Sequence, residues 1–415
     1  MADTPNLRTD GNRLWESLAE MAKIGATEKG GCCRLALTDL DKQGRDLFVR
    51  WCEEAGCSIK IDKMGNIFAR RPGRNNDLAP IVTGSHLDTQ PTGGRFDGVF
   101  GVLAGLEVVR SLNDLGYETE RPIEVAVWTN EEGSRFPPAM VASGVFSGEF
   151  SLEYGLSRAD SDGKTMGEEL ERIGYAGNEE VGGRDVHAYF EAHIEQGPIL
   201  EIEEKTIGIV TDAQGQRWYE LNLTGVESHA GPTPMPVRRD ALVSASKIVQ
   251  EVNRIGHAHP PHACATVGQI ISSPNSRNVI PGHVFLTIDF RHPDGDTLQQ
   301  MDDALKTFCA QIQAEDEVQI EVIDFWQFES THFDEACVEA VREGAKIAGY
   351  SNMDICSGAG HDAVYMAQVA PAGMIFIPCE DGISHNEIEN ATPEDCAAGT
   401  NVLLHAVLSR AGAAG

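Results

Sequence analysis

The sequence predicts an α/β protein with a mainly parallel sheet, into which a smaller α+β domain is inserted. Three observations predict this fold. Apolar runs of strand length alternate with runs of helical length as far as residue 213. From residue 214 to residue 330 the pattern changes to half-exposed strands and two long helices. Five histidines and acids of metal-ligand type lie in or after the predicted strands, four of them before this insertion and one after it. We therefore expect residues 1–213 and 331–415 to form a single domain.

The larger domain is expected to begin with two helices. An apolar face formed by Leu14, Leu18, Met21 and Ile24 predicts a helix over residues 10–30, and a second helix is predicted over 40–56. Buried strands are expected at residues 79–83, 122–129 and 189–197, with a helix at 98–109. Strands that alternate with helices in this way favour parallel pairing.

The inserted domain is expected to have a β-α-β-β-α-β order, as in ferredoxin-like folds. Residues 218–224 alternate between apolar and polar, which is typical of a half-exposed antiparallel strand. Further strands are predicted at 263–271, 283–290 and 318–323, and helices at 240–255 and 297–315. Residues 214–330 therefore predict one compact unit.

Side chains that bind metals lie at the carboxyl ends of the predicted strands, where open α/β sheets place their sites. The candidate ligands are His86, Asp97, Glu132, His193 and His385. Of the adjacent pair Glu131 and Glu132, one can bind a metal while the other holds a proton, because neighbouring side chains point apart. Nitrogen and oxygen ligands suit Zn, Mn, Co or Ni, and a carboxylate that bridges two ions is typical of hydrolases.

Composition excludes several classes of partner. The chain has 415 residues and a formal net charge of −31, without a basic cluster, so neither nucleic acid nor an anionic membrane is expected as a partner. We find no signal peptide and no apolar run of membrane-spanning length. The ten cysteines include no CxxC pair and are interpreted as mostly buried thiols. These features predict a cytoplasmic location.

Several long motifs resemble those of one known family. They are GSHLDTQPTGGRFDG (84–98), WTNEEGSRFPPAMVASGVFSG (128–148), EAHIEQG (191–197), NVIPG (278–282), DFRHPD (289–294), GAGHDA (358–363) and SHNE (384–387). In this order they resemble the hydantoinase/carbamoylase branch of the M20 metallopeptidase-like amidohydrolases. The resemblance implies an enzyme that binds two divalent metal ions per subunit and forms a homodimer through the inserted domain, which also acts as a lid.

The resemblance also implies roles for individual residues. His86 and His193 would hold one ion, Glu132 and His385 the other, with Asp97 bridging them and Glu131 as general base. His229 would stabilise the oxyanion. A ureido acid substrate would contact the remaining residues of the implied site, which are Gln196, Asn278, Arg291 and Gly360. Peptidase members usually have an acid at the place of His193, which favours the carbamoylase branch.

The implied reaction is hydrolysis of N-carbamoyl-L-amino acids to the amino acid, CO2 and ammonia. Allantoate amidohydrolase and β-ureidopropionase remain alternatives, because both also need a ureido pocket and a carboxylate clamp. A catalytically silent dimeric binding protein is disfavoured by the complete set of ligands. Asp88 is expected to orient His86, and the spacing gives no role to His361 or Asp362.

Overall fold

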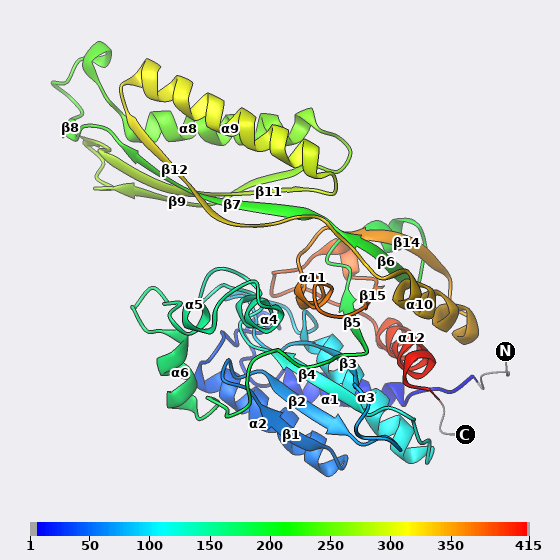
Figure 1. Ribbon diagram of the computed structural model, residues 1–415. Coiled ribbons are helices and arrows are strands. Elements are labelled where there is room, and N and C mark those ends of the chain that lie inside the picture. Colours follow the sequence, from blue (N-terminus) through cyan, green and yellow to red (C-terminus); the bar gives the residue numbers. More distant parts are fainter. Residues whose placement is uncertain (1–5, 413–415) are drawn as a thin grey trace. The chain divides into compact units, whose positions relative to one another are not determined.

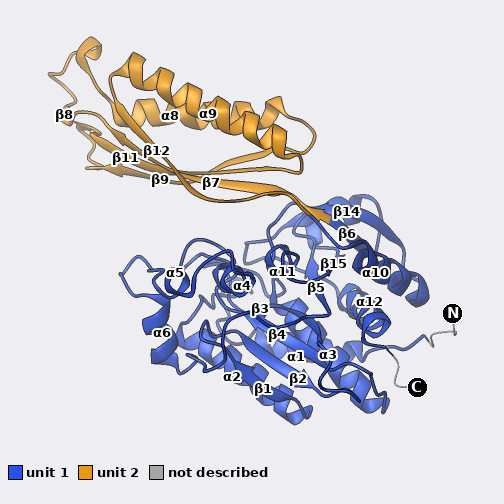
Figure 2. Ribbon diagram, in the orientation of Figure 1, with its two compact units in different colours: residues 1–211, 332–415 blue, residues 212–331 orange. Residues whose placement is uncertain are grey.

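The computed structural model describes residues 6–412, which divide into two compact units. Unit 1 contains the described residues of 1–211 and 332–415, and unit 2 is Asp212–Thr331 (Figure 2). The chain leaves unit 1 once and returns to it once, so unit 2 is an insertion in the sequence of unit 1.

Unit 1 is built on a nine-stranded sheet with the order β1-β2-β4-β3-β5-β15-β6-β13, in which β14 pairs with β6 (Figure 1). Its strands are β1 Ser58–Ile61, β2 Ile67–Arg71, β3 Ile81–His86, β4 Ile123–Trp128, β5 Ala188–Ile194, β6 Ile207–Ala213, β13 Thr331–His332, β14 Asn352–Ser357 and β15 Ala372–Ile377. The central strands β4, β3, β5 and β15 are parallel, whereas β1, β2 and β6 pair antiparallel. A mainly parallel centre is confirmed, and its flanks are antiparallel.

The four central strands are buried along their whole length because helices cover the sheet. The helices of unit 1 are α1 Gly11–Met21, α2 Asp39–Glu54, α3 Val99–Asp114, α4 Val141–Ser147, α5 Leu152–Leu156, α6 Met166–Ile173, α7 Ile199–Ile202, α10 Glu335–Ala348, α11 Asp362–Met366 and α12 Pro393–Ala411. Helix α3 packs against β3 and β5 and is buried on almost every side, which explains its nearly continuous apolar sequence.

Helix α1 is shorter than the sequence pattern predicts. It ends at Met21, and the expected continuation to residue 30 is wrong. Gly25 has a positive φ of 88°, and Ala26 forms an isolated β-bridge with Cys32. A turn that needs a left-handed glycine therefore interrupts the helix, although Ile24 continues its apolar spacing.

Unit 2 is a four-stranded antiparallel sheet with the order β12-β7-β11-β9, and helices α8 and α9 lie along one face of it (Figure 2). Its elements are β7 Gly215–Thr224, β8 Ser228–His229, α8 Ala241–Ala258, β9 Cys264–Ser273, β10 Val279–Ile280, β11 His283–His292, α9 Gly295–Asp316 and β12 Gln319–Phe328. Alternate residues of β11 are buried and form one core with the helices, which is why this strand alternates in sequence.

Candidate metal centre

Three parallel strands bring the candidate ligands to one edge of the unit 1 sheet. β3 ends at His86, β4 ends shortly before the Glu131–Glu132 pair, and β5 carries His193 next to its last residue. β3 pairs in parallel with both β4 and β5, so their carboxyl ends meet at the same edge. The side chains that follow these strands can therefore converge.

The first group of possible ligands consists of His86, Asp97 and His193, and all three are buried. Oδ1 of Asp97 lies 3.2 Å from Nε2 of His193 and 3.6 Å from Nε2 of His86. Asp97 directly precedes the N-cap of α3, Gly98, whose φ of 66° leads the chain into the helix. A side chain at position 98 would strike the His86 ring, because an added Cβ would lie 2.3 Å from its Cε1.

The second group consists of Asp97, Glu132 and His385. Nε2 of His385 is 3.4 Å from Oδ2 of Asp97 and 3.4 Å from Oε2 of Glu132. Asp97 thus belongs to both groups, with one carboxylate oxygen directed to each. The His385 side chain is about half exposed, so this group opens towards solvent, whereas the first group is enclosed.

Two of the histidines are held in the tautomer that leaves Nε2 available as a metal ligand. Nδ1 of His86 lies 2.9 Å from the carbonyl oxygen of Asp88, and Nδ1 of His193 lies 2.9 Å from that of Ile194. A ring nitrogen facing a carbonyl must carry the hydrogen and donate it. When the ring is neutral, the lone pair is then on Nε2, the atom that points towards Asp97.

Asp88 contacts His86, the residue that we expected it to orient. Its backbone carbonyl, not its carboxylate, meets His86. The carboxylate accepts hydrogen bonds from the backbone N–H groups of Glu131 and Glu132, at 3.3 and 3.2 Å. Asp88 therefore fixes the turn that presents the two adjacent glutamates as well as the ring of His86.

Glu131 points back towards the first group, with Oε2 3.4 Å from Nε2 of His86. Burial raises the pKa of Glu131 well above its ordinary value, and the charge of His86 offsets this only in part. Its carbonyl accepts a hydrogen bond of 2.7 Å from the N–H of Met140, which closes the loop after β4. Glu131 is in neither of the three-residue groups that contain Asp97.

The charges in the centre fit a divalent cation. Burial raises the pKa of Glu132 to about 8, with the negative charge of Asp97 adding to the effect. Burial alone would also raise the pKa of Asp97, but without a metal ion the hydrogen bonds donated by protonated His193 and His86 hold it well below its usual range. The buried histidines His86 and His193 share this space with four buried carboxylates, which belong to Asp88, Asp97, Glu131 and Glu132. Cations held by these nitrogens and oxygens would balance the excess negative charge.

Gln196 also lies in the centre. Its Nε2 donates to Oδ2 of Asp97 at 2.8 Å and to Oγ of Ser384 at 3.3 Å. Sequence reasoning missed two further residues: Gln90, which donates to Oε2 of Glu132 at 2.7 Å, and the buried Glu389. Glu389 follows the SHNE motif closely, but nothing in a single sequence reveals that this acid is buried.

Three other candidates belong to unit 2. His229 lies on β8, is exposed, and accepts a hydrogen bond from the N–H of Gly231 at its Nδ1. Asn278 precedes β10, and its carbonyl accepts from the N–H of Ala230, which joins the two segments. Arg291 is on β11 in an ion pair with Asp289, at 2.7 Å.

Gly360 and His361 lie between β14 and α11 in unit 1, and Asp362 is the first residue of α11. The His361 ring packs 4.5 Å from that of His193, and Asp362 accepts a hydrogen bond of 2.5 Å from Ser143 on α4. Glu191 accepts hydrogen bonds from Ser85 and from the N–H of Ala363. The buried side chains of Glu191, His361 and Asp362 thus support β5 and α11 next to His193.

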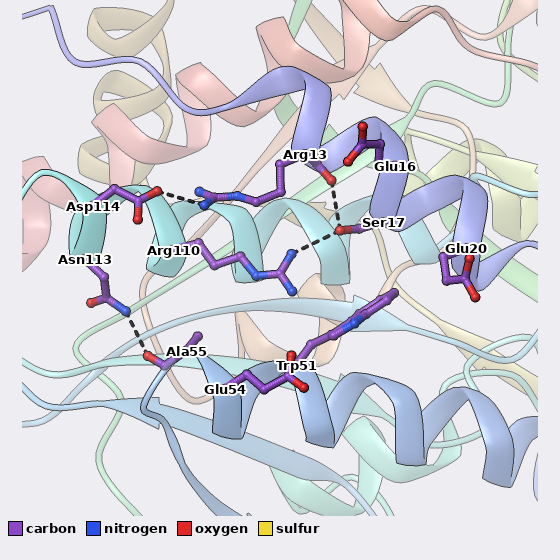
Figure 3. A pocket seen from close by; sticks show the side chains of 10 residues that line it. All are labelled: Arg13, Glu16, Ser17, Glu20, Trp51, Glu54, Ala55, Arg110, Asn113 and Asp114. Atoms are coloured by element: carbon purple, nitrogen blue, oxygen red, sulfur yellow. Dashed lines mark hydrogen bonds and ion pairs between the residues drawn. The ribbon is translucent and has the colours of Figure 1, made fainter.

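A cleft of about 580 Å³ elsewhere in unit 1 has different chemistry (Figure 3). It lies among α1, α2 and α3. Arg13 on its wall pairs with Asp114, and Arg110 donates to Ser17 and lies over the Trp51 ring. No residue that lines this cleft belongs to the candidate ligand groups.

In the part of the chain that the structure describes, no helix is both long enough and apolar enough to cross a bilayer. The family model for peptidase family M20/M25/M40 matches residues 82–409.

Curated relatives match nearly the whole chain. An N-carbamoyl-L-amino-acid amidohydrolase of Rhizobium meliloti is 52% identical over 406 residues, which are 98% of each chain. An allantoate amidohydrolase of Bacillus subtilis (strain 168) is 32% identical and covers 94% of this chain and 96% of its own. A crystal structure of an amidase of the hydantoinase/carbamoylase family from Burkholderia vietnamiensis has 66% identity and a TM-score of 0.96. It covers 97% of this chain and 98% of its own.

Proposed function

Because the chain belongs to the M20/M25/M40 peptidase family, in its hydantoinase/carbamoylase branch, we propose that it hydrolyses the ureido C–N bond of N-carbamoyl-L-amino acids. The products would be the free amino acid, CO2 and ammonia. The observation that carries the proposal is the 52% identity to an N-carbamoyl-L-amino-acid amidohydrolase over 98% of both chains. The candidate ligand set, which is complete in this chain, supports an active enzyme rather than a silent binding protein.

The proposed cofactors are two divalent metal ions, drawn from Zn, Mn, Co and Ni. M20 enzymes are metal-dependent, and the chain contains suitable ligand groups. His86 and His193 would hold one ion, Glu132 and His385 the other, and Asp97 would bridge them. When bound, such a pair activates water as a nucleophile near neutral pH and polarises a carbonyl group.

The protein's own groups then have separate tasks. Glu131 takes a proton from the attacking water and delivers it to the leaving nitrogen. Its side chain is buried, which keeps bulk water away from the carboxylate. Asp88, bound to the two N–H groups of the Glu131–Glu132 turn, holds the base in place.

Roles in substrate recognition are proposed for the residues that the family resemblance implies. Gln196 would contact the ureido group, and the backbone at Gly360 would line the substrate. His229 would stabilise the oxyanion by donating a hydrogen bond. Arg291, together with Asn278, would bind the substrate carboxylate, because a guanidinium can pair with both oxygens at once.

Unit 2 is proposed as the lid and as the dimer interface. Strand β9 is at the edge of its sheet, and Ile270 and Ile271 on it are 49% and 52% exposed. An edge strand with exposed apolar residues favours pairing with a second chain. Light scattering tests this directly: Ile271→Lys should shift a wild-type dimer towards the monomer, and a wild-type monomer would contradict the proposal.

Allantoate amidohydrolase is the second candidate, since the Bacillus subtilis relative carries that name at 32% identity. β-Ureidopropionase activity differs by one methylene in the substrate, which pocket size distinguishes only weakly. The test is ammonia release by the metal-loaded protein from N-carbamoyl-L-methionine, N-carbamoyl-β-alanine and allantoate. The proposal expects the highest kcat/KM with the carbamoyl-L-amino acid.

A further inference from the structure

Glu389 joins two loops that carry candidate ligands, although its own carboxylate is in neither group that contains Asp97. Oε1 accepts hydrogen bonds from the backbone N–H groups of Phe96 and Asp97, at 3.1 and 3.0 Å. Oε2 accepts from the hydroxyl of Ser384 at 2.8 Å. One carboxylate therefore holds both the loop of Asp97 and the residue that precedes His385.

The position of Glu389 is tightly defined by its surroundings. The residue is only 2% exposed. A Cβ built on Gly94 would lie 2.0 Å from Oε1, so the carboxylate is packed directly against the backbone of the Asp97 loop. A glycine at position 94 is therefore required by the close approach of Glu389.

Ser384 extends this link to the side chain of Asp97. Its Oγ lies 3.0 Å from Oδ2 of Asp97 as well as 2.8 Å from Glu389. Oδ2 is the oxygen that faces His385. His385 itself has a φ of 53°, in the left-handed region that residues other than glycine adopt uncommonly.

We propose that Glu389 is a positioning residue for the second metal position, formed by Asp97, Glu132 and His385. It holds the Asp97 loop and the Ser384–His385 segment at a fixed separation, so that their ligand atoms reach one ion together. The first position depends less on this link, because His86 and His193 come from strands β3 and β5, which the sheet already fixes. The inference depends on the metal pair of the proposed function, but on no particular substrate.

The structure also supplies conservative and control variants. Glu389→Gln keeps an oxygen acceptor for the two N–H groups of the Asp97 loop. Glu389→Ala removes both connections and leaves a cavity against Gly94. Glu107 is an equally buried glutamate on α3, 1% exposed, whose partners include Arg13 and Ser111. Glu107→Ala therefore reports the general cost of deleting a buried carboxylate.

The experiment titrates metal-free protein with Co²⁺ against a competing chelator and follows the visible spectrum and the two binding constants. Glu389→Ala should bind the second equivalent of Co²⁺ about 10- to 100-fold more weakly, the usual loss when a group that orients a metal ligand is removed. The affinity for the first equivalent should change much less. Glu389→Gln should recover most of the second affinity, and Glu107→Ala should bind both equivalents as the wild type does.

Equal affinities of the wild type and Glu389→Ala for the second equivalent would overturn the inference. A uniform loss of both equivalents, matched by Glu107→Ala, would overturn it as well, because it would indicate general destabilisation. If Glu389→Ala does not fold, Ser384→Ala breaks the same link from the other side and should also weaken the second equivalent selectively. A wild type that binds two ions but cleaves no ureido substrate would contradict the proposed reaction and leave this test decisive.

Discussion

Asp97 and His193 face one another through the atoms that a metal ion would bind: Nε2 of His193 lies 3.2 Å from Oδ1 of Asp97, and both side chains are buried. Because Nδ1 of His193 is engaged by a backbone carbonyl, the Nε2 lone pair is directed into this space. The second oxygen of Asp97 faces His385 in the same way. This arrangement places one carboxylate between two possible metal positions.

The shared position of Asp97 predicts different metal contents for two variants. Asp97→Ala should lose both ions, because this carboxylate belongs to both groups. His385→Ala should retain roughly one ion per chain, since the other group keeps all three of its ligands. Elemental analysis after gel filtration measures both contents. Equal contents in the two variants would contradict the bridging assignment.

Replacing the proposed base should separate chemistry from metal binding. Glu131→Gln should lower kcat about 100- to 10,000-fold, the usual contribution of general acid–base catalysis, with metal content unchanged. Glu132→Gln, one residue further on, should instead reduce metal content because its oxygen belongs to the second group. Ammonia release and elemental analysis on the same samples give both values. An active Glu131→Gln enzyme would exclude Glu131 as the base.

Arg291 should control KM for substrates that carry a carboxylate. Arg291→Lys replaces the proposed bidentate contact with the substrate carboxylate by a single ammonium charge. It should raise KM about 10- to 100-fold with little change in kcat. Arg217→Lys is a matched control on the neighbouring strand β7, where Arg217 lies 3.4 Å from Asp302. Steady-state kinetics with N-carbamoyl-L-methionine test the pair. The clamp assignment would be wrong if both variants changed KM alike.

The metal-free protein should lose stability as the pH rises. The pKa of Glu132 is about 8 in the folded protein, against an ordinary value of 4.5, mainly because of burial. The folded state therefore binds a proton that the unfolded state releases between pH 4.5 and 8. The free energy of unfolding should fall across this range, and Glu132→Gln should show a smaller slope. Urea titrations of both proteins at several pH values measure the difference, and parallel pH profiles would contradict it.

The sequence predicted the parts of the fold that depend on local patterns. The apolar runs and glycines predicted His86 at the end of a buried strand, His193 within another and Asp97 near a helix start, and the structure has them there. The antiparallel flanks of the sheet could not be predicted, because pairing direction depends on connections between distant segments. The end of α1 at Met21 was missed because the apolar spacing continues to Ile24.

The candidate site was predictable for residues that stand in motifs and less so for those that support them. Asp88 was expected to orient His86 and contacts it through its backbone carbonyl, but the contact of its carboxylate with the Glu131–Glu132 turn was not predicted. Gln90 and Glu389 were not predicted, because their contacts depend on which loops meet in three dimensions. Spacing in the sequence identifies possible ligands, but not the groups that hold them in place.

Ammonia release by the wild-type protein, reconstituted with Mn, Zn, Co or Ni, tests the central claim most directly. The substrates are N-carbamoyl-L-methionine, its D-enantiomer, N-carbamoyl-β-alanine and allantoate. N-acetyl-L-methionine, which yields no ammonia, is followed by its free amine. We predict metal-dependent turnover with the highest kcat/KM for N-carbamoyl-L-methionine. A preference for allantoate would contradict the proposed substrate, and no turnover with any metal would contradict the proposed enzyme.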